Sequence, residues 1–258
     1  MKIYEPAGRA REYSPLALNY FKGCDHGCKY CYVQPMMRRF NSNYDHSNVS
    51  CDLNLNELEK SIIKLSREDR KKQVLLSFTG DPYCGHESGQ TREVLNVLLK
   101  HQIHTAILTK NPGKAFKDIN IFEQFEHFKI GSTLTFNDDK KSKEWEPGAP
   151  TSKERIKGLK ELQQHGIKTW VSFEPVIIPS QSIALMEEII PFIDHVKVGK
   201  LNNFNGLDKK VDWPRFLFDA VLTLRKAGVK FYIKNDLAIY NKGVYLSGDE
   251  INEDYLNI

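Results

Sequence analysis

Three cysteines stand close together near the start of the chain, in the stretch GCDHGCKYCY at residues 23–32. Cys24, Cys28 and Cys31 have the spacing C-x3-C-x2-C, and the chain has only two other cysteines. A [4Fe-4S] cluster held by three thiolates would explain this count, because its fourth iron stays open to a substrate or cofactor. The spacing therefore favours an iron–sulfur centre that takes part in chemistry.

Two other interpretations of the triplet stay open. A structural zinc site needs four ligands, which His26 or Cys51 could complete, although the x3/x2 spacing is unusual for zinc. Ordinary loop or buried cysteines would account for any single thiol. Three thiols within eight residues of a chain with five cysteines argue against that last interpretation.

The composition indicates the setting in which this centre works. The chain has 258 residues, of which 40% are hydrophobic, and a formal net charge of +4, so it suits one domain over residues 1–258 and permits an anionic partner. Five cysteines are too few for a disulfide scaffold, and no apolar signal segment opens the chain, so we expect a reducing, cytoplasmic location. No apolar run approaches the ~18 residues of a membrane span, so no membrane partner is expected.

Seven short runs of β-branched or aromatic residues are predicted to be strands. Most are apolar on both faces, as expected of a parallel sheet that is covered on both sides. They lie at residues 16–21, 73–79, 104–109, 128–134, 168–174, 194–199 and 229–234.

Amphipathic helical segments alternate with these strands. Thr151 and Glu154 form a predicted capping box at the start of one helix, which ends at Gly166, and another helix follows Asp212 and ends at Gly228. Six or seven β/α units are slightly few for an eight-fold barrel. The expected fold is an α/β partial (β/α)6-type TIM-like barrel with a C-terminal extension or hairpin, and its chemistry should lie at the carboxyl ends of the strands.

The cysteine triplet follows the first predicted strand, and in this position it resembles the motif of the radical S-adenosylmethionine (SAM) superfamily. Other stretches resemble the spore photoproduct lyase-like branch over about residues 15–200: SFTGDPY at 77–83, LTKNP at 108–112, EPGAPTSKERIKGLKELQQHGI at 146–167 and VSFEPVIIP at 171–179. The resemblance implies that a [4Fe-4S] cluster and SAM are cofactors. It also implies a one-electron reductant of the flavodoxin or ferredoxin type, whose electron cleaves SAM to methionine and a 5′-deoxyadenosyl radical that abstracts hydrogen from a substrate.

The resemblance assigns roles to several residues in this chain. Cys24, Cys28 and Cys31 would hold the cluster, and Tyr30 would pack near the adenine. Gly80 would let the backbone approach the methionine part of SAM, and Asp81 would accept its ammonium group. Three more residues would complete the cofactor contacts. Lys110 would pair with the methionine carboxylate, Ser132 would contact the ribose, and Glu174 would contact ribose or substrate.

One departure from the branch concerns the hydrogen donor. The lyase uses a cysteine on its second strand, and that position here is Phe78, so the thymine-dimer reaction is not implied for this chain. Cys84 lies just beyond the GDPY stretch and could reach the same cavity, and Tyr83 is a second candidate donor. Cys51 is expected to be inert.

The residues after 200 form the variable part of the branch, and we expect substrate choice to depend on them. Candidate contacts are Lys200, Asn202, Asn203, Lys234 and Asn235, and the stretch from Phe231 to Gly248 could form a hairpin that helps to bind nucleic acid or only covers the edge of the sheet. Nucleic acid or a nucleotide is the favoured substrate, and a peptide or small metabolite is the alternative. A non-enzymatic iron–sulfur or metal-binding module would not need the polar residues at the strand ends.

Overall fold

A single eight-stranded sheet runs through the molecule in the order β1-β2-β5-β6-β7-β8-β9-β10. The computed structural model describes residues 1–87, 89–201, 204–253 and 255. The strands of this sheet are β1 Ile3–Tyr4, β2 Leu16–Leu18, β5 Val74–Leu76, β6 Thr105–Leu108, β7 Phe128–Thr133, β8 Lys168–Phe173, β9 His195–Val198 and β10 Lys230–Ile233. All seven predicted strands are therefore present, and β1 is an addition.

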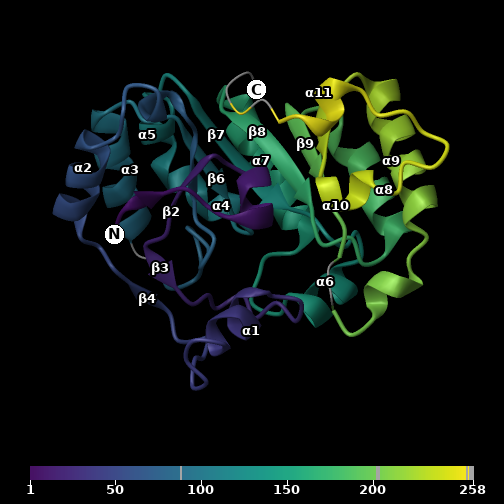
Figure 1. Cartoon of the computed structure of the whole chain (residues 1–258), viewed down its shortest axis with the longest axis horizontal. Helices are drawn as coiled ribbons and strands as arrows, with labels where there is room; N and C mark the ends of the chain where they lie inside the picture. The colour runs from purple at the N-terminus through teal and green to yellow at the C-terminus, as the bar shows by residue number, and fades with distance from the viewer. Residues whose placement is uncertain (88, 202–203, 254, 256–258) are drawn as a thin grey trace.

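The pairing within this sheet is parallel from β2 to β10, and only β1 runs antiparallel to its neighbour β2. A separate ribbon pairs β3 Phe21–Lys22 with β4 Ser50–Cys51. The fold is thus a mostly parallel α/β partial barrel, as predicted, with the strands joined by helices on the outside (Figure 1).

The helices are α1 Val33–Arg38, α2 Leu55–Ile63, α3 Gln90–Lys100, α4 Pro112–Ala115, α5 Ile119–Phe122, α6 Asp139–Trp145, α7 Ser152–Gln164, α8 Pro179–Ile189, α9 Trp213–Ala227, α10 Asn235–Ala238 and α11 Gly248–Ile251. The capping box of α7 is formed by Thr151 and Glu154 as predicted, and Gly228 ends α9 with a φ of 66°. The segment after β10 forms α10 and α11. The C-terminal part is therefore an extension, and the alternative of a hairpin was wrong.

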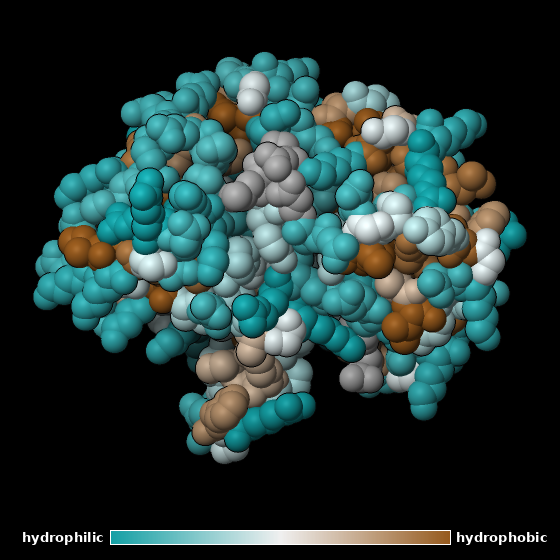
Figure 2. All heavy atoms as spheres, turned by 45° about the horizontal axis from the view of Figure 1, so that its top comes forward, coloured by the Kyte–Doolittle hydropathy of each residue, from teal (hydrophilic) through white to brown (hydrophobic). Residues whose placement is uncertain are grey.

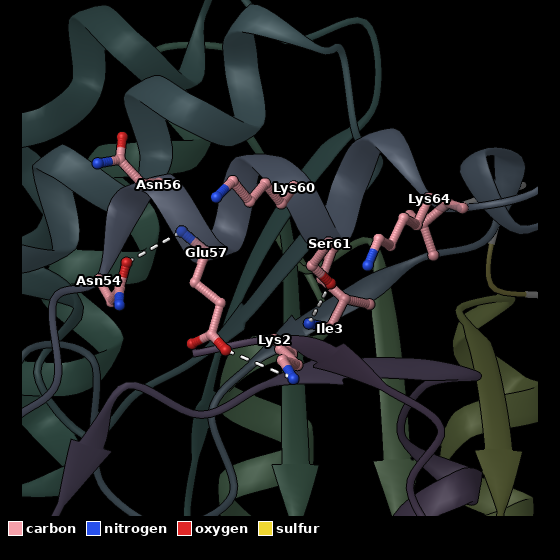
Figure 3. Close-up of a pocket in the computed structure, with 9 residues that line it drawn as sticks. Lys2, Ile3, Asn54, Asn56, Glu57, Lys60, Ser61 and Lys64 are labelled. Atoms are coloured by element: carbon pink, nitrogen blue, oxygen red, sulfur yellow. Dashed lines mark hydrogen bonds and ion pairs between the residues drawn. The ribbon is translucent and has the colours of Figure 1, made fainter.

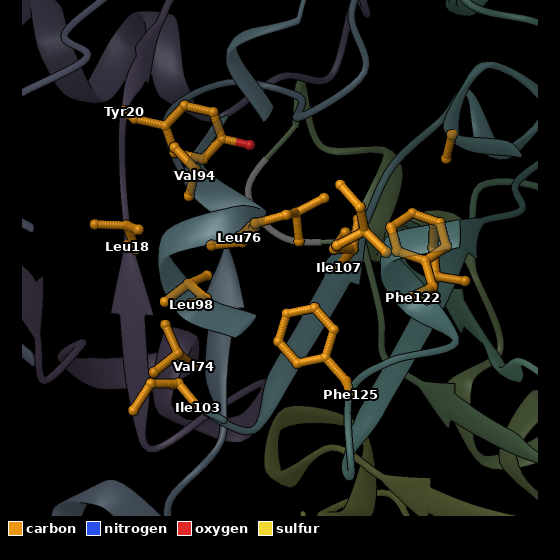
Figure 4. Close-up of a cluster of buried hydrophobic side chains, with 14 of the residues drawn as sticks. Leu18, Tyr20, Val74, Leu76, Val94, Leu98, Ile103, Ile107, Phe122 and Phe125 are labelled. Atoms are coloured by element: carbon orange, nitrogen blue, oxygen red, sulfur yellow. The ribbon is translucent and has the colours of Figure 1, made fainter. Parts of the chain in front are cut away.

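Two apolar cores lie between the sheet and the helices. One packs α2, α3 and α5 onto the strands from β2 to β6, where Leu18, Leu76 and Ile107 are completely buried (Figure 4). The other packs α7, α8 and α9 onto β8, β9 and β10. Among the described residues no helix is both long and apolar enough to cross a membrane.

The concave interior of the sheet is filled by a smaller cluster around Trp170, which packs with Leu75 and Ala106. A Cβ at Gly131 would lie 2.5 Å from the Trp170 ring, so only glycine leaves room for the indole at this position. Tyr13 follows the 3-10 helix Gly8–Glu12 and packs against Trp170 from the open side, with 6.2 Å between the ring centroids. The N-terminal segment thus reaches into the barrel beside the strand ends.

Candidate active site

A cavity of about 470 Å³ opens at the carboxyl ends of the parallel strands. Its wall includes Cys24, Cys28 and Cys31, which lie on the loop between β3 and α1. The opposite wall consists of residues that directly follow β8, β9 and β10. The three predicted cluster ligands are therefore brought to one cavity at the end of the barrel where chemistry was expected.

The cysteine loop is held in place by hydrogen bonds to other strand-end loops. Asp25 accepts hydrogen bonds from the backbone N–H groups of Gly85 and His86, at 3.0 and 3.1 Å, and its carboxylate is 2.8 Å from the His86 ring. Burial would raise the pKa of Asp25, but these contacts outweigh it and lower that pKa. The Lys29 N–H donates to the Trp145 carbonyl at 2.9 Å, so the loop is fixed at both ends.

The chemistry of the donor set fits a metal cluster. Burial raises the pKa of all three thiols, to about 11 at Cys28, so without a cation they stay protonated. Positively charged iron would reverse this preference, since metal binding displaces thiol protons. His26, which is 2% exposed, also lines the cavity, and its Nε2 atom has no hydrogen-bond partner within the described part of the chain. Buried polar atoms normally have a partner, so the three thiols and the His26 imidazole fit a cavity that holds an iron–sulfur cluster better than an empty one.

The zinc interpretation with Cys51 as the fourth ligand finds little support in this geometry. Cys24, Asp25 and His26 each place one potential ligand atom within 4.8 Å of the others. The Asp25 carboxylate already accepts the hydrogen bonds from the loop at 85–86, and Cys51 lies on β4, outside the cavity lining. A closed tetrahedral site would need four free ligands.

Gly80 and Asp81 lie on the cavity wall after β5, as predicted. A Cβ at Gly80 would lie 2.7 Å from the Gly23 carbonyl oxygen and 2.8 Å from Phe21 Cβ, so this glycine lets the β5 loop pack against the cysteine loop. Asp81, which is 9% exposed, accepts hydrogen bonds from the Thr109 hydroxyl at 2.6 Å and the Lys110 N–H at 2.7 Å. These bonds fix the position of the Asp81 carboxylate beside the cysteines.

Lys110 and Tyr30 also line the cavity, and both contact a residue that sequence reasoning missed. Glu146, which is completely buried, lies 3.4 Å from Lys110 Nζ, accepts a hydrogen bond from the Tyr30 hydroxyl and pairs with the buried Arg155 guanidinium at 2.5 Å. Burial would raise the pKa of Glu146, but Lys110 and Arg155 outweigh it and lower that pKa to about 2. Glu146 thus offers one carboxylate to two cations, Lys110 on the cavity wall and Arg155 behind it.

Glu174 lies on the far wall of the cavity, in a network that was also missed. Its Oε2 atom accepts hydrogen bonds from Lys234 Nζ and from the Tyr13 hydroxyl, both at 2.5 Å, and the ammonium of Lys234 is 4.4 Å from the centre of the Tyr13 ring. Burial raises the pKa of Tyr13, and the neighbouring Glu174 raises it further, so the phenol keeps its proton. A Cβ at Gly199 would lie 3.0 Å or less from Lys234 and Glu174, so glycine makes room for this pair.

Two further cations line the cavity near this network. Arg9 is 3.6 Å from Asp236, and Lys200 lies above the rings of Trp213 and Tyr240, with 5.2 Å and 5.6 Å to the ring centres. Asn202 and Asn203, which were predicted to contact substrate, lie outside the described residues. The Asn235 backbone N–H donates to the Glu12 carboxylate at 2.7 Å, and Asn235 is not among the described residues that line the cavity.

Three predicted site residues do not reach the cavity. Cys84 and Tyr83 have no exposed surface and pack in the core beneath the loop, where the Tyr83 hydroxyl donates to Asp118 at 2.9 Å. Neither side chain is among the described residues that line the cavity, so this placement does not support either of them as the hydrogen donor. Ser132 is also fully buried, and its neighbour Thr133 lines the cavity instead, because successive side chains of β7 point to opposite faces. The predicted ribose contact of Ser132 does not fit this placement.

A second hollow, of about 850 Å³, lies between β1 and α2 and shares no residue with the cysteine cavity (Figure 3). Its wall is basic and includes Lys2, Lys60 and Lys64. The Glu57 backbone N–H donates to Asn54 at 3.0 Å, and the Glu57 carboxylate is 3.5 Å from Lys2. It contains none of the predicted site residues. We therefore place the chemistry in the cysteine cavity.

The fold and the cysteine cavity are those of a partial α/β barrel with its site at the carboxyl ends of the strands. Comparison with known proteins identifies the family. The sequence model described as "Radical SAM superfamily" matches residues 18–193, which is more than half of the chain, so the chain belongs to the radical SAM superfamily. It is 30% identical over 162 residues to the uncharacterized protein MJ0683 of Methanocaldococcus jannaschii, a match that covers 62% of this chain and 60% of that protein. It is 26% identical over 172 residues to the uncharacterized protein ORF301 of Acidianus two-tailed virus, covering 64% and 57%. The chain thus spans about three fifths of these relatives.

Solved structures of two radical SAM enzymes share the fold. Streptococcus suis SuiB bound to S-adenosylmethionine has a TM-score of 0.63 and 18% identity, and the match covers 90% of this chain and 53% of SuiB. A spore photoproduct lyase mutant with bound S-adenosylmethionine and dinucleoside spore photoproduct has a TM-score of 0.68 and 11% identity, covering 88% and 78%. These likenesses confirm the predicted radical SAM fold.

Proposed function

We propose that the chain is a radical SAM enzyme that binds a [4Fe-4S] cluster through Cys24, Cys28 and Cys31 and acts on nucleic acid or a nucleotide. The observation that carries this proposal is the meeting of these thiols with Asp81 and Lys110 in one cavity at the carboxyl ends of the strands. A structural or electron-transfer cluster would need no such polar wall. When bound, the cluster and SAM supply a 5′-deoxyadenosyl radical for hydrogen abstraction.

The chain's own residues would bind and orient SAM. Asp81 offers a fixed carboxylate to the methionine ammonium group, and Lys110 offers its ammonium to the methionine carboxylate. Tyr30 lies between two cluster ligands in sequence and lines the cavity, where its ring would pack against the adenine. Glu174 on the far wall would contact ribose or substrate through its hydrogen-bonded carboxylate. For Ser132 we propose no cofactor contact, and Thr133 takes its place on the wall.

The favoured substrate follows from the charge of the far wall. Three cations line it, namely Arg9, Lys200 and Lys234, and all three lie outside residues 18–193, which the superfamily model matches. Arg9 pairs with Asp236 and Lys234 pairs with Glu174, so part of this positive charge is offset. The cations on this wall would bind an anionic group such as a phosphate. The spore photoproduct lyase structure holds a dinucleoside, which agrees with this class. SuiB has been solved with a precursor peptide, so a peptide is the second candidate, since the same wall would accept acidic side chains.

The location and the reductant belong to the same proposal. The five cysteines are free in the structure, and a cluster with an open iron needs protection from oxygen, so we infer a reducing, cytoplasmic setting. The electron would come from a flavodoxin- or ferredoxin-like protein. We treat residues 1–258 as one functional unit.

The proposal is tested by anaerobic reconstitution followed by incubation with SAM, dithionite and deuterated substrates. We expect methionine and 5′-deoxyadenosine as products. With a deuterated oligonucleotide or nucleotide, deuterium should pass into 5′-deoxyadenosine, whereas deuterated peptides should transfer none. A loaded cluster that leaves SAM intact would exclude the enzyme, and transfer only from a peptide would select the second candidate.

Replacement of Asp81 by alanine should weaken SAM binding by roughly 1.5–3 kcal/mol, because one charge-assisted hydrogen bond to the ammonium group is lost. Equilibrium binding of SAM to the reconstituted protein, with iron and sulfide contents checked, measures the effect. Asp139→Ala serves as control, since Asp139 on α6 is a half-exposed carboxylate that pairs with Lys153 at 3.3 Å and lies outside the cavity lining. Wild-type affinity in the Asp81 variant would remove this carboxylate from the cofactor site.

A further inference from the structure

The surface next to the last cluster cysteine has an unusual combination of exposed aromatic and basic side chains. Tyr32 directly follows Cys31 and is 56% exposed, and Phe40, just beyond α1, is 85% exposed. Arg38 and Arg39 are exposed between them. We call Tyr32, Arg38, Arg39 and Phe40 the α1 surface. In Figure 1 α1 and the loop after it project from the body of the molecule, and the projecting part in Figure 2 shows apolar and strongly hydrophilic residues side by side.

The α1 surface is directly connected to the cysteine cavity. Tyr32 lines the cavity together with Cys31, and its hydroxyl donates to the Phe78 carbonyl at 2.8 Å. The same ring therefore borders the cavity on one side and solvent on the other. An electron that enters the protein here has a short path to a cluster bound by Cys31, and electron-transfer rates fall steeply with distance.

The charge around this surface is positive. Between residues 22 and 49 the chain has four lysines or arginines and two aspartates. The carboxylate of Asp25 is occupied by the loop at 85–86, and Lys29 pairs with Glu144 at 3.9 Å, so Arg38 and Arg39 carry the positive charge of the α1 surface itself. Arg38 donates to the Tyr44 carbonyl at 3.0 Å, whereas the Arg39 guanidinium makes no hydrogen bond or ion pair with any residue that the structure describes. An exposed cation of this kind is suited to a partner of opposite charge.

We propose that the α1 surface is the docking site for an acidic one-electron carrier protein of the flavodoxin or ferredoxin type, an inference that rests on the proposed function. Redox partners meet through small, short-lived interfaces, which are guided by complementary charge and need only a few central contacts. Phe40 supplies an apolar centre, and Arg38 and Arg39 supply the charge that steers an acidic partner. A docked carrier would be placed beside Tyr32 and Cys31.

The test compares a protein electron donor with a small one that needs no docking site. Arg38→Glu/Arg39→Glu protein is reconstituted and reduced either by an acidic flavodoxin, with its reductase and NADPH, or by dithionite. We expect cluster reduction by flavodoxin, followed by stopped-flow absorbance, to be at least tenfold slower than in the wild type at low salt. Phe40→Ala should slow it less. Reduction by dithionite and the 5′-deoxyadenosine formed with it should be unchanged.

The matched control is Lys60→Glu/Lys64→Glu, which makes the same change in charge in the basic hollow of Figure 3 and should reduce at the wild-type rate. If the double arginine variant loads its cluster poorly, Arg39→Glu alone decides, because the Arg39 side chain supports no described contact. If the variants with a loaded cluster are reduced by flavodoxin at the wild-type rate, the proposal is overturned. If such variants also lose oligonucleotide binding, the surface is assigned to nucleic acid, and the proposal is overturned as well. Dithionite-driven SAM cleavage by wild-type protein tests the proposed function separately.

Discussion

Replacement of Cys28 by alanine should abolish cluster assembly, with iron and sulfide falling to background and SAM cleavage becoming undetectable. Cys28 is the middle ligand of the triplet and lies on the cavity wall with Cys24 and Cys31. With two thiolates left, a four-iron cluster would have two unprotected irons. We would measure iron, acid-labile sulfide and the absorbance of the anaerobically reconstituted variant, followed by 5′-deoxyadenosine formation with dithionite and SAM.

The matched control is Cys51→Ala, since Cys51 lies in β4, away from the cavity. That variant should load a full cluster and cleave SAM as the wild type does. A full cluster in Cys28→Ala would show that the triplet is not the ligand set. Loss of the cluster in both variants would instead point to a ligand set that includes Cys51, as in the zinc interpretation.

The fold could be predicted well from the sequence because its signals are local. Runs that are apolar on both faces marked most of the parallel strands, and Thr151 with Glu154 marked the start of α7. The C-terminal part was harder. The tyrosines and the NKG turn after β10 suggested a hairpin, but Leu237 is completely buried in the core beside α9, and this packing favours a short helix. Tertiary contacts of this kind leave no periodic pattern in so short a segment.

The site could be predicted where a motif fixes both the residue and its direction. The cysteines, Gly80, Asp81 and Lys110 all line the cavity. Nearness in sequence was misleading for Cys84, because the loop after Asp81 turns back into the core. For Ser132 a one-residue offset on β7 was enough to reverse the side chain's direction.

The missed residues belong to ion pairs between distant segments. Glu146 pairs with Arg155 and with the predicted Lys110, and Tyr13 donates to the predicted Glu174, which also pairs with Lys234. The contacts to Lys110, Tyr13 and Lys234 exist only once the strands are assembled. The sequence carried at most a weak signal for the first, since Glu146 is one of two glutamates in EWEPGAP and stands shortly before a helix that contains Arg155. Without the assembled barrel nothing indicated that both charges would be buried.

Replacement of Glu146 by glutamine should destabilise the protein by about 3–5 kcal/mol, because it leaves the buried Arg155 without a counter-charge. Arg155 has no exposed surface and donates to the Thr133 carbonyl at 2.9 Å and the Pro150 carbonyl at 2.8 Å, so it cannot turn to solvent without breaking the β7 wall of the cavity. Urea-induced unfolding of wild-type and variant protein, compared at equal cluster content, measures the loss. Glu144→Gln, which removes an exposed carboxylate on α6, is the matched control and should leave the unfolding midpoint unchanged.

The same pair predicts a component of acid sensitivity. Because the pKa of Glu146 is lowered from 4.5 to about 2 in the folded protein, its ionised form stabilises the fold fully above pH 4.5 and progressively less as the pH falls toward 2. This component amounts to about 3 kcal/mol by the linkage between pKa and stability. The difference in unfolding free energy between wild type and Glu146→Gln should therefore be largest near neutral pH and shrink below pH 4.5. A difference that stays constant down to pH 3 would show that glutamine acts only through packing, and that the charge of Glu146 does not stabilise the cavity wall.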